Sequence, residues 1–72
     1  MLPVHIVSRS YHDPRFDEPT VNRCRVYEPD PQKAVAMIQA MTAPFEKVEL
    51  AWSEWVPEEE YQAIRTLGYF RP

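Results

Sequence analysis

Residues 28–44 read EPDPQKAVAMIQAMTAP, and this stretch decides the fold because it predicts one helix between two extended segments. Asp30 suits the N-cap of a helix, and Pro31 suits the first helical position, where no backbone N–H needs a partner. Apolar residues then recur at helical spacing from Ala34 to Ile38. Because Pro44 disfavours helical backbone at the residue before it, we expect a helix over residues 31–42.

The sequence on both sides of this helix alternates between apolar and polar residues, as half-buried strands do. The alternation covers residues 2–11 and 21–27 before the helix and residues 47–53 after it. A polar loop framed by Pro14 and Pro19 separates the first two segments, which predicts an antiparallel hairpin with a long connection. A second helix is expected from Pro57 to Leu67, with Gly68 suited to end it.

The order β-β-α-β-α predicts a small two-layer α+β sandwich, with a three-stranded, mainly antiparallel sheet and both helices on one face. Seventy-two residues make a single domain, residues 1–72. A right-handed crossover through the first helix would place the second and third strands parallel, on either side of the first. The face expected beneath the helices consists of Leu2, Val4, Ile6, Cys24, Val26, Val48, Leu50 and Trp52.

Composition excludes several classes of protein. The chain has one glycine and eight prolines, so it has too few glycines for a P-loop or a dinucleotide-binding turn. Its single cysteine, Cys24, forms no internal disulfide, which favours a reducing compartment. No signal peptide and no apolar run of about 20 residues is present, so we expect a cytoplasmic protein without a membrane partner.

Catalytic and metal-binding patterns are weak. His5 and His12 are seven residues apart and would point to opposite sides of a continuous strand, and Cys24 adds only one further ligand. A chain this short also has little room for a concave substrate pocket. We therefore expect no enzyme activity, no catalytic residue, no metal site and no cofactor.

A basic side of the sheet is one candidate binding surface. Strand alternation places on the side away from the helices the residues Arg9, Tyr11, Arg23, Arg25 and Tyr27. Single-stranded RNA or a nucleotide would stack on the tyrosines and meet the arginines. Two alternatives remain open: the side chains simply cover the sheet and pair with Glu49, or a second copy packs face to face in a homodimer.

An acidic surface around a tryptophan is the other candidate. Residues 28–60 hold eight acidic residues against two lysines, a net charge of −6 in a chain of net charge −3. The predicted partner-binding residues are Trp55, Glu54, Glu58, Glu59, Tyr69 and Phe70. An exposed tryptophan with a polar rim is typical of protein interfaces. Two alternatives are that Trp55 packs beneath the second helix, or that the carboxylates imitate a nucleic acid.

Taken together, these patterns favour a small non-enzymatic module that regulates or inhibits a larger intracellular protein by covering part of its surface. Small acidic chains of this kind include regulators encoded by phages and mobile elements. The alternative is a domain that binds nucleotides or single-stranded RNA on the basic sheet face. The overall acidic charge argues against general nucleic-acid binding, which depends on neutralising phosphates.

Overall fold

The computed structural model describes residues 1–68 and 70–71, with the side chains of Leu67, Phe70 and Arg71 outside that description. Its elements in chain order are β1 (Leu2–Tyr11), β2 (Thr20–Val26), α1 (Pro31–Gln39), β3 (Lys47–Val56), α2 (Glu58–Leu67) and β4 (Phe70–Arg71). The predicted small α+β fold and the order β-β-α-β-α are confirmed. The two-residue strand β4 is an addition that the sequence did not indicate.

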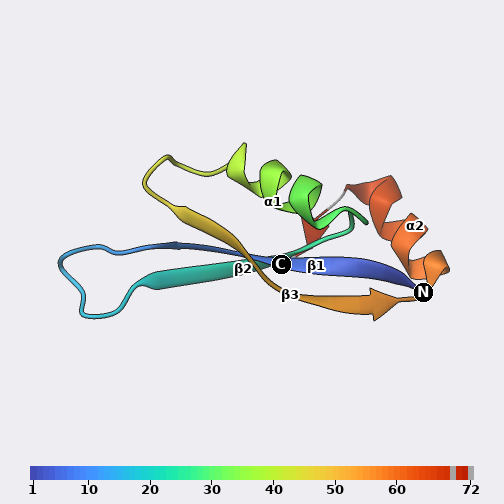
Figure 1. Ribbon diagram of the computed structural model, residues 1–72, viewed down its shortest axis with the longest axis horizontal. Helices are drawn as coiled ribbons and strands as arrows, with labels where there is room; N and C mark the ends of the chain where they lie inside the picture. The colour runs from blue at the N-terminus through green and yellow to red at the C-terminus, as the bar shows by residue number, and fades with distance from the viewer. Residues whose placement is uncertain (69, 72) are drawn as a thin grey trace.

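The sheet has the strand order β3-β1-β2-β4. The central strand β1 pairs antiparallel with both β2 and β3, so β2 and β3 run parallel to each other, as expected. Helix α1 joins these two strands and lies over the sheet (Figure 1). At the far side, β4 pairs with the last two residues of β2.

Local interactions explain where α1 begins and ends. The Gln32 backbone N–H donates to the Asp30 carboxylate at 2.9 Å, which confirms the expected N-cap. The helix ends at Gln39, three residues earlier than predicted. There the backbone changes to tighter turns, in which Met41 N–H donates to the Ile38 carbonyl and Thr42 N–H to the Gln39 carbonyl.

Two small apolar clusters replace the single core that the sequence predicted. In one cluster, Ala34 and Ile38 of α1 pack with Val7 and Val26. In the other, Tyr61 of α2 packs with Tyr27 and with Val4 and Ile6 of β1. Both helices lie above the sheet in Figure 1, yet they contact alternate residues of the strongly twisted strand β1. The expectation of one continuous apolar face beneath both helices is therefore wrong.

Strand register explains why the two clusters lie on different sides of β1. Val7 lies opposite Cys24, and Ile6 lies opposite Arg25, so even-numbered residues of β1 share a side with odd-numbered residues of β2. A bulge then changes the phase of β3, because Ile6 faces Trp52 while Val7 faces Leu50. Leu50 and Trp52 consequently point to opposite sides of the sheet.

The C-terminal end of α2 needs its glycine. Gly68 has a φ of +134°, a value that residues with a Cβ rarely adopt. The molecule is elongated, with extents of 44 × 20 × 19 Å. Its long axis follows the strands, and the loop between β1 and β2 projects beyond both helices (Figure 1).

Candidate functional site

Strand β3 forms a free edge of the sheet. It is ten residues long, and no other described strand pairs with its outer side. Such an edge presents unpaired backbone N–H and C=O groups, which makes it a template for another strand. Three large apolar side chains on β3 are exposed: Leu50 by 42%, Trp52 by 46% and Trp55 by 64%. We call the outer side of residues 47–56, together with these side chains, the β3 edge.

Trp55 lies near the end of the β3 edge, opposite Pro3 of β1. Helix α2 begins three residues later, and its contact with the core is made by Tyr61. The alternative in which Trp55 packs beneath the second helix is therefore wrong. Glu58 and Glu59 are exposed in the first turn of α2, three and four residues after Trp55 in the sequence.

Of the other residues predicted for partner binding, Glu54 and the backbone of Phe70 lie elsewhere. Glu54 follows Ser53 and precedes Trp55 on β3, so it points to the opposite side of the sheet from Trp55. The backbone of Phe70 pairs with Val26 in β4, at the other end of the sheet order from β3, and its side chain is not described. Tyr69 lies outside the described residues.

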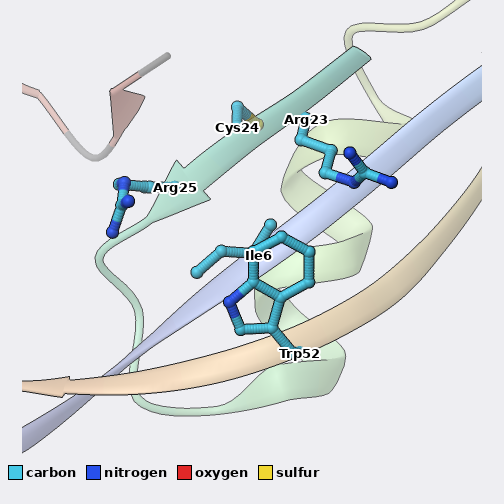
Figure 2. A pocket seen from close by; sticks show the side chains of 5 residues that line it. All are labelled: Ile6, Arg23, Cys24, Arg25 and Trp52. Carbon is cyan, nitrogen blue, oxygen red and sulfur yellow. The ribbon is translucent and has the colours of Figure 1, made fainter. Parts of the chain in front are cut away.

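A shallow hollow of about 180 Å³ lies on the side of the sheet to which Glu54 points. Figure 2 shows the Trp52 ring over Ile6, with Arg23 and Arg25 on either side and Cys24 between the two arginines along β2. The Arg23 guanidinium lies 5.5 Å from the centre of the Trp52 ring, in cation–π geometry. Within residues 1–68 and 70–71, Arg23 has no hydrogen bond or ion pair, so its N–H donors face solvent.

Glu54 contacts two of the residues that line this hollow, Trp52 and Arg25. Its carboxylate accepts a hydrogen bond of 3.0 Å from Trp52 Nε1 and forms an ion pair with Arg25. The Trp52 hydrogen bond, followed by the hydrogen bond from Arg25, lowers the pKa of Glu54 from its ordinary value. Arg25 is therefore neutralised within the chain, whereas Arg23 keeps its charge available.

The other three residues of the predicted basic face lie elsewhere. Arg9 points to the side of the sheet that carries Val7, where its guanidinium donates to the Glu46 carboxylate at 3.1 and 2.9 Å. Tyr11 makes an edge-to-face contact with Phe45, with ring centres 5.7 Å apart. Tyr27 is buried against Tyr61. The structure therefore does not bring the five residues onto one face, because the strand register separates them.

The histidines and the cysteine have structural contacts. Buried His5 donates from Nε2 to the Pro29 carbonyl at 2.9 Å, and its Nδ1 lies 2.6 Å from Ser53 Oγ, which links the loop before α1 to β3. His12 Nε2 donates to the Phe16 carbonyl within the β1–β2 loop. Burial raises the pKa of the half-buried Cys24 thiol, which leaves it a weak nucleophile. No group of three or more potential metal ligands occurs among the residues that the structure describes.

The exposure of Trp52 was not predicted from the sequence, because all even-numbered residues of β3 were expected to point to one side of the sheet, beneath the helices. The bulge that puts Leu50 and Trp52 on opposite sides of the sheet has no glycine or proline to mark it. No protein-family model, curated protein or solved structure matches the chain. In the described part of the chain, no helix has the length and apolar character to cross a membrane.

Proposed function

We propose that this chain is a small non-enzymatic protein-binding module, which regulates or inhibits a larger intracellular partner by covering one of its surfaces. The observation that carries the proposal is the β3 edge, where Trp55 is 64% exposed on a strand with an unpaired outer side. Exposed apolar patches with a polar rim mark interaction sites, and aromatic side chains are the usual anchors of protein interfaces.

Charge supports a partner surface of basic character. The first turn of α2 adds three exposed carboxylates, Glu58 to Glu60, directly after the β3 edge. None of them forms an ion pair with another described residue. A polar rim of one sign around an apolar anchor favours a partner of the opposite sign and speeds its encounter.

The test is recovery of a partner from a lysate of the source cells by wild type and by the double variant Trp55→Ala, Glu58→Lys. We expect wild type to retain a partner that the variant loses, because the variant removes the anchor and reverses one rim charge. Val21→Ala is the matched control, since Val21 is also exposed and lies on β2, away from the β3 edge. Equal recovery of the same partner by wild type and the double variant contradicts the proposal.

A second candidate function is binding of a nucleotide or of single-stranded RNA in the hollow beside Trp52. It is favoured by one observation: the guanidinium of Arg23 lies over the exposed Trp52 ring and has no ion pair with any described residue. An aromatic ring provides a stacking surface for a base, and an arginine meets a phosphate. This site is smaller than the basic face expected from the sequence, since it keeps only Arg23 and Arg25.

The second candidate is tested by titrating the protein with nucleotides and short oligonucleotides at about 50 mM salt, where phosphate contacts are strong. The second candidate is supported if the ligand quenches tryptophan fluorescence and Arg23→Ala weakens its affinity about tenfold. The control is Arg15→Ala, because Arg15 is an exposed arginine of the β1–β2 loop that pairs with Asp13. The absence of binding at this salt concentration contradicts it.

A further inference from the structure

We infer that the partner contributes an extended basic segment, which pairs with the outer side of residues 52–56 as an added β-strand. This inference rests on the proposed function and specifies how the contact forms. It commits to a strand with an apolar side chain against Trp55 and with lysines or arginines at the end that meets the start of α2.

The backbone of β3 provides the template. Residues 52–56 pair without interruption with residues 2–6 of β1, whereas the register shifts between the partners of Ile6 and Val7. A bulge bends a strand and interrupts hydrogen bonding, so the regular part of the edge is the segment after it. Five residues in a regular strand are enough for a short peptide to add by main-chain hydrogen bonds.

Side chains on the two sides of this segment set the chemistry of the partner. Ser53 and Trp55 point to one side, and only Trp55 of these two is large and apolar. On the other side, the Glu54 carboxylate is already paired with Arg25. The unpaired negative charge lies beyond Val56, at Glu58 to Glu60. A complementary strand therefore needs an apolar residue beside Trp55 and cations at one end.

The same charges disfavour a second copy of this chain as the occupant. Two β3 edges that pair antiparallel through residues 52–56 bring two Glu54–Arg25 ion pairs together at the centre, so the uncompensated charge lies at the two ends. They also bring a carboxylate-rich α2 start to each end of the joined strands. Charges of like sign that gather in one assembly repel each other. A basic segment meets the carboxylates at the start of α2 with opposite charge, whereas a second copy adds a further set of carboxylates.

The experiment uses the full chain and a synthetic peptide of about nine residues, in which valine and threonine alternate and three lysines occupy one end. A second peptide carries the lysines at the other end, because strand addition is allowed in either direction. Neither peptide contains tryptophan, so the fluorescence of Trp52 and Trp55 reports binding. Amide hydrogen exchange by NMR identifies which strand is protected.

We expect one of the two peptides to bind and to slow exchange of outward amides in residues 52–56, with no change in the free part of β2, residues 20–24. Trp55→Ala should weaken binding at least about tenfold, as truncation of an interface tryptophan does. Val21→Ala should leave the affinity unchanged. Two further peptides carry N-methyl groups on alternate amides, so that each has one of its two hydrogen-bonding edges blocked. The peptide whose β3-facing edge is blocked should lose at least about tenfold in affinity, and the other should keep the affinity of its parent.

The inference is overturned if neither peptide binds at about 50 mM salt, or if both alternately methylated peptides bind as well as their parent. Protection confined to residues 20–24, or concentration-dependent dimerisation of the protein alone through β3, also overturns it. These outcomes are distinct from failure of the proposed function. A lysate partner that depends on Trp55, combined with unchanged exchange in residues 52–56 on peptide addition, leaves the proposed function standing and removes strand addition.

Discussion

Replacement of Tyr61 by phenylalanine should stabilise the protein. Tyr61 is fully buried between α2 and the sheet, where its ring packs edge-on against Tyr27 with ring centres 5.6 Å apart. Its hydroxyl has no hydrogen-bond partner among the residues that the structure describes. A buried polar group without a partner costs about 1–3 kcal/mol, whereas the ring contacts remain in phenylalanine.

The expected gain is about 1 kcal/mol, at the lower end of that range. In a domain of this size, about 1 kcal/mol corresponds to a rise in Tm of about 4–8 °C. The assay is thermal unfolding followed by circular dichroism at pH 7. Tyr11→Phe is the matched control. Tyr11 is only partly buried, and it is the last residue of β1, away from Val4 and Ile6, which Tyr61 contacts.

The same hydroxyl makes a prediction about alkaline pH. Burial, which outweighs the opposing effect of Arg65, raises the pKa of Tyr61 from 10.0 to about 12. Between these two values the unfolded chain ionises this tyrosine and the folded chain does not, so the wild type loses stability as the pH rises. The difference in Tm between Tyr61→Phe and wild type should therefore widen above pH 10. A variant less stable than wild type at pH 7, or a constant difference up to pH 11, would refute the reasoning.

Three further predictions test other parts of the structure. Asp30→Ala should lower stability by about 1 kcal/mol in thermal unfolding, because it removes the N-cap of α1, whereas Asp17→Ala in the β1–β2 loop should have no effect. Alkylation of Cys24 by iodoacetamide at pH 8 should be slower in the folded protein than in denaturant, because burial raises the pKa of its thiol; equal rates would contradict this. Trp52→Phe should raise the pKa of Glu54 towards its ordinary value in an NMR titration, because it removes the hydrogen bond that lowers it; an unchanged midpoint would show that the bond is not formed in solution.

The fold was predictable from residues with strong local preferences. Asp30 and Pro31 mark the start of α1, Gly68 follows α2, and the alternation in β1 to β3 is regular enough to show the strands. The parallel arrangement of β2 and β3 was expected from the helical crossover between them, but the sequence did not determine that β1 lies between these two strands. These features depend on short stretches of chain, each of which carries its own signal.

The candidate site was harder to predict because it depends on how strands align. The loop between β1 and β2 is long enough to allow either register, and the observed one places Cys24 opposite Val7. The bulge in β3 then puts Leu50 and Trp52 on opposite sides of the sheet. The prediction placed Trp55 correctly away from the core, since it lies beyond the bulge and Tyr61 makes the contact between α2 and the core.

The most direct test of the role of the β3 edge is amide hydrogen exchange of the whole chain with and without the partner that it captures. We predict slower exchange in residues 52–56 in the complex. Trp55→Ala should lose both the partner and this protection. A complex in which exchange slows only in residues 20–24 or in the β1–β2 loop would place the contact on a different part of the sheet and contradict it.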